Sequence, residues 1–464
     1  MTIPRPLRVA IVGSGPAAFF TAESLLARPE LDVSVDMFER LPAPFGLVRF
    51  GVAPDHQKIK SVSRSFDKVA RTPGFRFYGN VDVGVHVMLE DLARHYHAVC
   101  FATGAQTDRR LGVPGEDLAR SHPATEFVAW YNGHPDFRDR EFDLSGERVA
   151  VIGVGNVAVD VARILCRTPE ELAGTDIAAY AQDALARSGV REVYLIGRRG
   201  PVQAAFTTPE VRELGELAGA DVTVPPEEVA LDPLSRAQLA ASDDRALAKK
   251  VEILEEFARR PRDAKPKLLT LRFLLSPVAV LGDASGGVSG LRLVRNRLED
   301  DGRGGARAVA TEHAEELPVD LVFRSVGYRG IALPGLPFDE RRGIVPNERG
   351  RVVRDGHPLP GIYVAGWIKR GPSGVIGTNK PCAVETVEAL LADVGRGVML
   401  QPDAPDPALA ETLVRSRRPA CVTYADWLRL DAQEIARGKA VGRPRVKITT
   451  VEEMLGVLAG KQVV

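Results

Sequence analysis

The chain has 464 residues, 45% hydrophobic and 26% charged, which is typical of globular proteins and leaves room for two or three domains. Lysine and arginine equal aspartate and glutamate at 61 each, so bulk charge does not favour a nucleic-acid partner. No run approaches the roughly 18 apolar residues of a transmembrane segment. The four cysteines form no C-x-x-C pair, so neither a dithiol centre nor a metal site is indicated.

A glycine-rich turn between a predicted strand and a predicted helix is the strongest signal in the chain. Residues 8–12 run apolar like a buried parallel strand, Gly13, Gly15 and Ala18 follow in G-x-G-x-x-A spacing, and 19–27 are predicted to be helical. The first glycine permits a tight turn, and the second lets a pyrophosphate approach the backbone. The helix N-terminus supplies N–H groups for the phosphates. This strand starts within ten residues of Met1, which leaves no space for a targeting peptide, so we expect a cytoplasmic protein.

An acidic residue follows where a dinucleotide would need one. The apolar run 33–38 ends at Glu39, and a carboxylate at the end of this second strand can hold a ribose diol. The alternative is a glycine turn in a sheet that binds no nucleotide. The next residues, 40–55, are punctuated by proline and glycine and are predicted to form an ordered loop. Asp55 is then expected to cap an amphipathic helix over 56–70, with His56 in its first turn.

The opening pattern is repeated in the middle of the chain. Residues 148–152 read as a strand, Gly153, Gly155 and Ala158 repeat the spacing, and a helix is predicted over 156–167. Two such units imply either two dinucleotides or one duplicated domain.

The second unit differs from the first at its next strand. The run 193–196 leads to Arg198 and Arg199, with no acid in the ribose position. Two guanidinium groups suit a 2′-phosphate, so this site is expected to prefer NADP over NAD. A charge-assisted contact contributes about 1.5–3 kcal/mol, or roughly 10- to 150-fold in discrimination. The alternative is a solvated basic turn.

The remaining elements follow from caps and periodicity. Thr208 and Pro209 are expected to open a helix with Glu210 in its first turn. Further predictions are a helix over 243–260, antiparallel strands over 271–281 and 290–298, strands over 319–326 and 362–365, a loop over 369–378, a helix from about Pro381, and a last helix with a capping box of Thr450 and Glu453. The fold class is therefore α/β with two Rossmann-like domains, the second inserted into the first, and strands before about Thr107 and after about Ser325 are expected to share a sheet.

Several motifs resemble the NADPH–ferredoxin reductases of the adrenodoxin-reductase type, especially their bacterial members. They lie in order between Val9 and Lys380: G-S-G-P-A-A, P-F-G-L-V-R-x-G-V-A-P-D-H, F-A-T-G-A-Q-x-D-R, V-I-G-V-G-N-V-A-x-D-V-A-R, G-R-R-G-P-x-Q-A-A-F-T-T, R-S-V-G-Y and G-W-I-K-R-G-P-S-G-V-I-G-T-N-K. The tail beyond is a weaker match, with R-P-R-V-K near its end.

The resemblance implies FAD in a domain made of 1–107 and 326–464, the latter with a C-terminal helical extension, and NADP(H) in a domain over 108–325. The implied FAD contacts include the glycines of the first glycine loop and are Gly13, Gly15, Ala17, Glu39, Leu47, Val83, Trp367, Gly374, Val375 and Ile376. The implied NADP contacts are Arg109, Val154, Gly155, Asn156, Val157, Arg198, Arg199, Glu210 and Gly374. Relatives often carry Asn or Gln where this chain has Val154, so only a backbone contact is expected there. Phe45 stands where some relatives have Trp.

The implied activity is that of a ferredoxin–NADP reductase: hydride passes from NADPH to the flavin, and single electrons then pass to a ferredoxin-type iron–sulfur protein, which could feed a monooxygenase. His56 and Glu210 match catalytic positions near the nicotinamide and flavin, where they could position the nicotinamide or move a proton. The alternatives are plain structural roles, with Glu210 complementing a helix dipole. Gly374 is expected to be glycine because a backbone touching a flat ring tolerates no side chain.

Family analogy also predicts a basic face for an acidic partner, with candidates Lys58, Lys60, Arg64, Lys369 and Arg370. The rival functions are a disulfide reductase, a glutamate-synthase small subunit, and a flavoprotein that only binds nucleotide as a sensor or scaffold. The missing C-x-x-C weighs against the first, and the lack of cluster cysteines near the N-terminus against the second.

Overall fold

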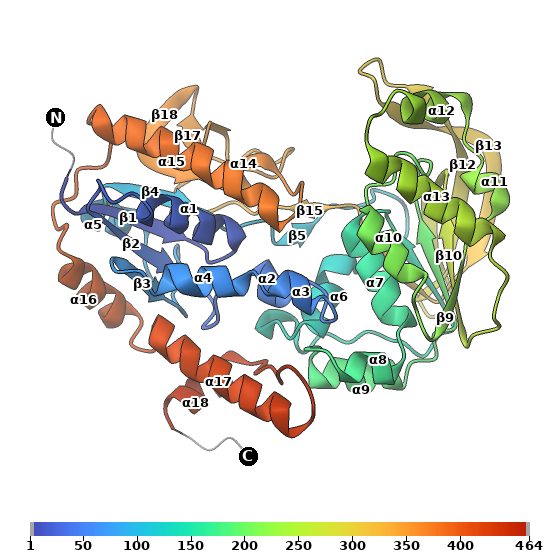
Figure 1. Cartoon of the computed structure of the whole chain (residues 1–464), viewed down its shortest axis with the longest axis horizontal. Coiled ribbons are helices and arrows are strands. Elements are labelled where there is room, and N and C mark those ends of the chain that lie inside the picture. The colour runs from blue at the N-terminus through green and yellow to red at the C-terminus, as the bar shows by residue number, and fades with distance from the viewer. Residues whose placement is uncertain (1–3, 461–464) are drawn as a thin grey trace. The chain divides into compact units, whose positions relative to one another are not determined.

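The computed structural model of the protein describes residues 4–460. The chain forms two compact units, each with its own sheet and core (Figure 1). Unit 1 contains the chain up to Thr107, the short segment Asn132–Pro135, and the chain from Gly327 onward. Unit 2 contains Asp108–Tyr131 and Asp136–Val326. The segment that leaves unit 1 is tied to the one that returns, because the Gln106 N–H donates to the Arg329 carbonyl at 3.0 Å.

The strands of unit 1 are β1 (Leu7–Val12), β2 (Val33–Phe38), β3 (Phe75–Tyr78), β4 (Ala98–Phe101), β15 (Tyr328–Arg329), β16 (Asn347–Glu348), β17 (Arg351–Arg354) and β18 (His357–Val364), with β5 (Thr107–Asp108) at the boundary between the units. Its helices are α1 (Pro16–Leu26), α2 (Leu47–Phe50), α3 (Gln57–Lys60), α4 (Ser63–Ala70), α5 (Leu89–His95), α14 (Trp367–Arg370), α15 (Asn379–Gly395), α16 (Pro407–Arg417), α17 (Tyr424–Ala440), α18 (Val451–Leu458) and the 3₁₀ turn η2 (Ile376–Thr378).

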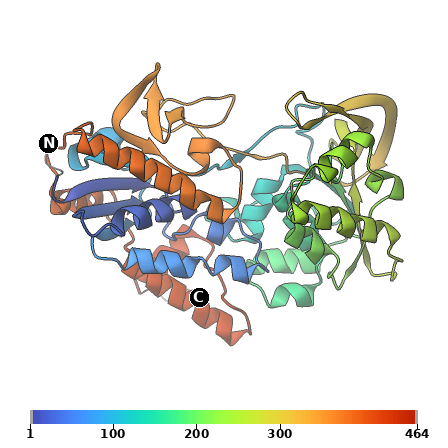
Figure 2. The ribbon, with the colours of Figure 1, turned by 45° about the horizontal axis from the view of Figure 1, so that its top comes forward.

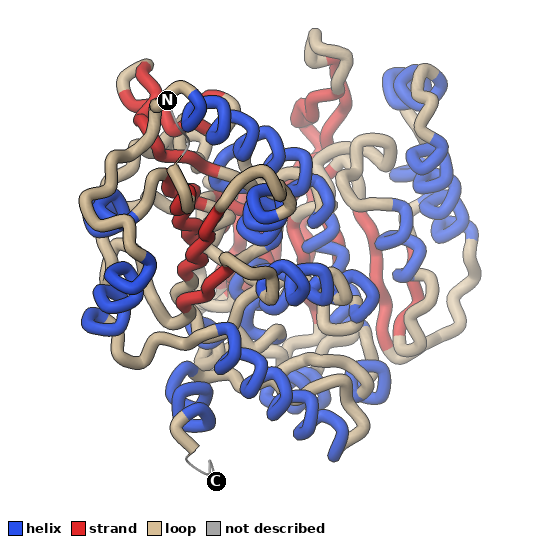
Figure 3. Tube along the Cα trace, turned by 60° about the vertical axis from the view of Figure 1, so that its left-hand side comes forward, coloured by secondary structure: helices blue, strands red, loops and turns tan. Residues whose placement is uncertain are grey.

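The main sheet of unit 1 has the strand order β16-β17-β18-β4-β1-β2-β3, and the run from β18 to β3 is parallel. Strands from both ends of the chain therefore share one sheet, as predicted. Alternate residues of β1 face opposite sides: Val9 and Ile11 pack in the core that includes α1 and α15, and Ala10 and Val12 pack in the core that includes α5 and α16. Figure 3 shows helices on both sides of the strands. This two-sided burial explains the continuous apolar runs.

The strands of unit 2 are β6 (Ser121–Pro123), β7 (Arg148–Ile152), β8 (Glu192–Ile196), β9 (Ala220–Thr223), β10 (Lys267–Arg272), β11 (Leu275–Gly282), β12 (Val288–Asp300), β13 (Ala306–Pro318) and β14 (Leu321–Arg324). Its helices are α6 (Ala124–Tyr131), α7 (Asn156–Cys166), α8 (Pro169–Ala173), α9 (Ala179–Ala186), α10 (Thr208–Leu214), α11 (Pro226–Val229), α12 (Pro233–Ala240) and α13 (Arg245–Arg259), with the 3₁₀ turn η1 (Pro135–Phe137) at the edge of the unit.

Unit 2 is built on a parallel sheet of order β6-β14-β7-β8-β10-β9. One face packs against helices, among them α6, α7 and α13. The other face packs against a separate antiparallel sheet of β11, β12 and β13, whose long hairpin is visible in Figure 2. The fold class is thus α/β with two Rossmann-like parallel sheets, as predicted.

The prediction of one continuous helix over 56–70 is wrong. It is divided into α3 and α4, because the Ser61 and Ser63 hydroxyls donate to the carbonyls of Lys58 and Lys60 and the backbone between them switches to shorter turns. The N-cap residue of α3 is His56 and not the predicted Asp55.

The predicted strand over 271–281 is also wrong, because it joins the end of β10 to β11. The chain turns between them at Leu274, where φ is +60°, and the Phe273 N–H leaves the sheet to donate to the Glu228 carboxylate at 2.7 Å. The whole strand β13 was missed, because its exposed polar residues give no apolar run.

Smaller corrections concern caps and loops. The N-cap of α10 is Thr207, because the Thr208 hydroxyl donates instead to the Ala246 carbonyl at 2.6 Å. The Thr450 hydroxyl caps α18, but Glu453 does not return the bond and pairs with Arg437. The loops predicted at 40–55 and 369–378 contain the short elements α2, α14 and η2.

Candidate functional site: two glycine loops

In the first glycine loop, residues 13–15, a side chain is sterically excluded at one glycine and has free space at the other. Gly13 has φ +103°, and a Cβ there would lie 2.6 Å from the Ala102 carbonyl oxygen, so the end of β4 excludes a side chain. A Cβ on Gly15 would meet no atom within 4 Å. Gly15 is the N-cap of α1, and among the described residues no side chain caps this helix. Open space in front of uncapped N–H groups fits a pyrophosphate.

Glu39 is built into the same loop. Its carboxylate accepts the Ser14 hydroxyl at 2.6 Å, the Ser14 N–H at 3.1 Å and the Leu41 N–H at 3.1 Å. Burial raises the pKa of Glu39, and these hydrogen bonds and Arg40 counter part of that rise. The carboxylate is therefore held at the carboxyl edge of the sheet, at the end of β2, where the ribose prediction needs it. Ser14, which the sequence analysis passed over, orients it.

The loop before α2 also lies against the first glycine loop. The Phe45 N–H donates to the Ser14 carbonyl at 3.0 Å, and a Cβ on Gly46 would lie 3.0 Å from the Gly15 Cα. Leu47 begins α2 directly after this contact. Val83 lies in the loop after β3, half-buried against the second core of unit 1. The Val81 N–H, just before it, donates to the Glu39 carbonyl at 2.9 Å.

The end of β18 completes this edge of the sheet. A Cβ on Gly366 would lie 2.5 Å from the Ala17 Cβ, so the start of α14 is in contact with the start of α1. Trp367 is the first residue of α14, with its indole N–H donating to the Ser373 carbonyl and its ring centroid 5.4 Å from that of Tyr328.

The turn at Gly374 gives a second reason for glycine, beside the predicted contact with a flat ring. Its φ is +78°, and an added Cβ would lie 2.5 Å from the Thr378 hydroxyl, so the turn itself already requires glycine. Val375 is 56% exposed, and its N–H donates to the same hydroxyl. Ile376 is half-buried against the core beside α1. The apolar Val375 side chain is thus left open on the surface.

The second glycine loop repeats the geometry of the first. Gly153 has φ +135°, and a Cβ there would lie 2.2 Å from the Ser325 carbonyl oxygen, whereas one on Gly155 would meet nothing within 4 Å. Gly155 is the N-cap of α7, which no side chain of the described residues caps.

Three further loop positions were assigned to NADP. The Asn156 amide oxygen already accepts the Thr207 N–H at 2.8 Å, which ties the second loop to α10. The Val154 carbonyl accepts the Ala205 and Phe206 N–H groups, and Val157 is half-buried in the first turn of α7.

The Arg198–Arg199 turn is cationic and is held by hydrogen bonds to two other strands. The Gly197 N–H donates to the Arg272 carbonyl at 2.8 Å, and the Arg198 carbonyl accepts the Asn296 amide at 2.8 Å. Arg198 is exposed and Arg199 half-buried, and neither forms an ion pair with any described residue. Burial, and then the charge of Arg198, lower the pKa of Arg199. An anion at this turn would relieve both effects.

The two residues predicted to be catalytic belong to different units. His56 is 9% exposed in unit 1, at the N-cap of α3, where its carbonyl accepts the Lys60 N–H. Glu210 is 8% exposed in unit 2, in the first turn of α10, with its carboxylate 3.5 Å from the buried guanidinium of Arg163. Arg109 is exposed on the connection that enters unit 2.

Two of the five candidates for the predicted basic face, Lys60 and Lys369, are wrong because they are buried. Lys60 and Lys369 are 8% and 7% exposed, with Lys60 bonded to Asn132 and Lys369 paired with Glu385 at 2.6 Å. Arg370 donates to Asn379. Of the five candidates, only Lys58 and Arg64 have exposed side chains.

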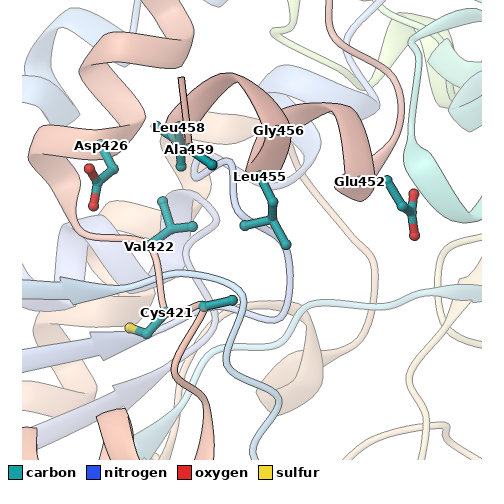
Figure 4. Close-up of a pocket in the computed structure, with 9 residues that line it drawn as sticks. Cys421, Val422, Asp426, Glu452, Leu455, Gly456, Leu458 and Ala459 are labelled. Atoms are coloured by element: carbon teal, nitrogen blue, oxygen red, sulfur yellow. The ribbon is translucent and has the colours of Figure 1, made fainter. Parts of the chain in front are cut away.

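The cavity in Figure 4 has a volume of about 470 Å³ and lies in unit 1 between α17, α18 and the loop before α17. It is lined by Ala420, Cys421, Val422, Asp426, Glu452, Leu455, Gly456, Leu458 and Ala459, so it contains no predicted site residue. None of the helices within 4–460 is long and apolar enough to cross a membrane.

The comparisons with known proteins agree with one another. A family profile described as pyridine nucleotide-disulphide oxidoreductase matches residues 7–216. The chain is 48% identical to NADPH-ferredoxin reductase FprA of Mycobacterium tuberculosis, covering 98% of this chain and all of that protein. It is 41% identical to the mitochondrial NADPH:adrenodoxin oxidoreductase of Arabidopsis thaliana, covering 98% and 96%.

The similarity extends to a solved structure and to longer proteins. The structure of Mycobacterium tuberculosis FprA in complex with NADPH matches with a TM-score of 0.92 at 48% identity, over 98% of this chain and all of that one. A probable ferredoxin/ferredoxin–NADP reductase of Mycobacterium bovis is 47% identical over 97% of this chain and 75% of its own length.

Proposed function

The chain belongs to the family of NADPH–ferredoxin reductases of the FprA and adrenodoxin-reductase type, and from this premise we propose that it carries electrons from NADPH, through FAD, to a ferredoxin-type iron–sulfur protein. The observation that carries the proposal is the pair of glycine loops. In each, the first glycine is closed off by a neighbouring carbonyl and the second opens onto an uncapped helix N-terminus. We place the protein in the cytoplasm.

FAD is assigned to unit 1 and NADP(H) to unit 2, because only unit 1 has a carboxylate at its second strand and only unit 2 has an arginine pair there. In unit 1 the proposed contacts are Gly13, Gly15, Ala17, Glu39, Leu47, Val83, Trp367, Gly374, Val375 and Ile376. In unit 2 they are Arg109, Val154, Gly155, Asn156, Val157, Arg198, Arg199 and Glu210, and Gly374 of unit 1 is assigned to NADP as well.

The flavin supplies the chemistry of accepting a hydride and releasing electrons one at a time. The chain's own residues bind and orient. Glu39 accepts hydrogen bonds from a ribose diol, Arg198 and Arg199 bind the 2′-phosphate, and the N–H groups of α1 and α7 bind phosphate oxygens. Glu210, held beside the Arg163 guanidinium, is an acceptor for an amide, and His56 is a group that can hold or pass a proton.

The test is an absorbance spectrum of the purified protein before and after NADPH. The expected protein is yellow, loses its flavin absorbance with NADPH, and reduces cytochrome c only when a ferredoxin is added. A yellow protein that NADPH does not bleach would favour a passive nucleotide binder. A colourless protein that stays colourless when supplied with FAD would contradict the proposal.

A further inference from the structure

The C-terminal region of unit 1 is bonded to the short helix α2, although the two are far apart in sequence. Trp427 of α17 lies edge-on to Phe45, with ring centroids 5.9 Å apart. The Arg49 guanidinium of α2 lies 5.1 Å from the centroid of the same indole ring. The loop that begins α2 is therefore packed on α17.

An ion pair lies at the centre of this contact. The Arg49 guanidinium donates to both carboxylate oxygens of Glu434, at 2.9 and 2.5 Å, and the side chains are 4% and 1% exposed. Arg445 and the Ile448 N–H donate to the same carboxylate. Burial alone raises the pKa of Glu434, but Arg49, Arg445 and these hydrogen bonds hold it below its ordinary value. Glu434 is thus a buried anion whose oxygens are all engaged.

The R-P-R-V-K motif near the end of the chain supplies the rest of the contact. Its Arg445 joins Glu434 to Asp431. Its Lys447 is 5% exposed and donates to the Arg49 carbonyl at 3.2 Å and to the Asn132 carbonyl at 3.0 Å. The motif therefore binds the backbone of α2 through Lys447 and, through Arg445, the carboxylate that holds the Arg49 side chain.

The same segment touches the first glycine loop on its other side. The Phe45 N–H donates to the Ser14 carbonyl, and a Cβ added to Gly46 would lie 3.0 Å from the Gly15 Cα. Phe45 has φ +84°, a conformation that a bulky residue adopts only when its surroundings hold it there. The C-terminal region provides that support from outside.

We propose that Glu434, together with Arg49 and Lys447, is a positioning site for FAD that holds the segment 45–50 against the glycine loop 13–15. The inference rests on the proposed function, because it takes FAD to be the ligand of that loop. If the segment 45–50 is already ordered before FAD binds, binding does not incur the entropy cost of ordering it. Contacts that hold the segment in place should therefore lower the Kd for FAD.

The experiment compares Glu434→Gln with Asp431→Asn in the full-length protein. Glu434→Gln keeps the shape and leaves Arg49 buried without its anion, so we expect the Kd of the apoprotein for FAD to rise at least tenfold. Asp431→Asn removes a carboxylate from the same helix and the same Arg445 partner, but Asp431 does not contact Arg49, so we expect less than a twofold change. FAD is titrated into apoprotein and followed by flavin fluorescence.

A second readout separates positioning from general stability. FAD raises the Tm of wild-type apoprotein, and a positioning role predicts that Glu434→Gln shrinks this increment. A merely structural role lowers the Tm of apoprotein and holoprotein equally, leaves Kd unchanged, and would overturn the inference.

Lys447→Met provides an independent variant if Glu434→Gln does not fold. It leaves the ion pair intact and removes the Lys447 hydrogen bonds to the Arg49 and Asn132 carbonyls. Because only the first of these supports α2, Kd is expected to rise roughly threefold to tenfold, the effect of about one hydrogen bond. An unchanged Kd in Lys447→Met would then overturn the inference. Wild-type protein that binds no FAD would instead contradict the proposed function itself.

Discussion

At the residue scale, we propose that the arginine pair discriminates between the two nicotinamide cofactors. Replacing Arg198 and Arg199 with Ala is expected to raise the KM for NADPH by roughly 10- to 150-fold per contact, because each charge-assisted bond contributes about 1.5–3 kcal/mol. The KM for NADH should change little, since NADH has no 2′-phosphate. Steady-state kinetics with both cofactors measure the effect. An equal change in the two KM values would contradict the proposal that these arginines bind the 2′-phosphate.

A second residue is expected to affect this discrimination through the backbone of Arg198. Asn296 is 5% exposed, and its amide donates to the Arg198 carbonyl and to Ser276, both at 2.8 Å. Asn296→Leu should loosen the arginine turn and raise the KM for NADPH roughly threefold to tenfold, the effect of about one hydrogen bond, with little change for NADH. Ser276→Ala is the control, because it removes the other partner of the same amide. A parallel rise for NADH would mean that the whole unit had been perturbed.

At the element scale, the two glycines of a strand–helix unit have separable roles. Gly15→Val is expected to give folded protein without FAD, because φ there is −78° and the added side chain enters the space left open for phosphate. Gly13→Ala is expected to lose on the order of 2–4 kcal/mol of stability, because φ is +103° and its Cβ would overlap the Ala102 carbonyl. Circular dichroism and flavin content distinguish the two. Normal FAD content in Gly15→Val would show that the first site is misplaced.

At the scale of the whole molecule, stability toward acid is expected to depend on a histidine that belongs to neither glycine loop. His122 of β6 packs against the rings of Phe142 and Phe323, and burial, followed by the charges of Arg324 and Arg140, lowers its pKa to about 4. An unfolded imidazole titrates near 6.5. Between these values only the unfolded chain binds the proton, so stability falls as the pH falls from about 6.5 to about 4.

His122→Phe keeps an aromatic ring at this position and removes the imidazole that binds the proton. The free energy of unfolding should then fall less between pH 7 and 4.5 than in the wild type, by on the order of 1–2 kcal/mol since the imidazole is partly exposed. Urea denaturation at a series of pH values measures the difference. A slope equal to that of the wild type would show that other groups dominate.

The amino-acid sequence by itself determined the strand–turn–helix units, the shared sheet and the family. Glycine spacing and apolar periodicity are local, and the blocked positions at Gly13 and Gly153 follow from backbone geometry that only glycine tolerates. Where local side chains compete with the backbone, as Ser61 and Ser63 do, the same patterns placed element boundaries wrongly.

Only the tertiary structure decided which side chains support the two loops. Asn296 and Arg198 are 98 positions apart, and Glu434 and Arg49 are 385 apart. It also buried Lys60 and Lys369, which looked like surface cations in the sequence. The physical reason is that a hydrogen bond or ion pair depends on proximity in space. No periodicity along the chain records such proximity between residues that folding alone brings together.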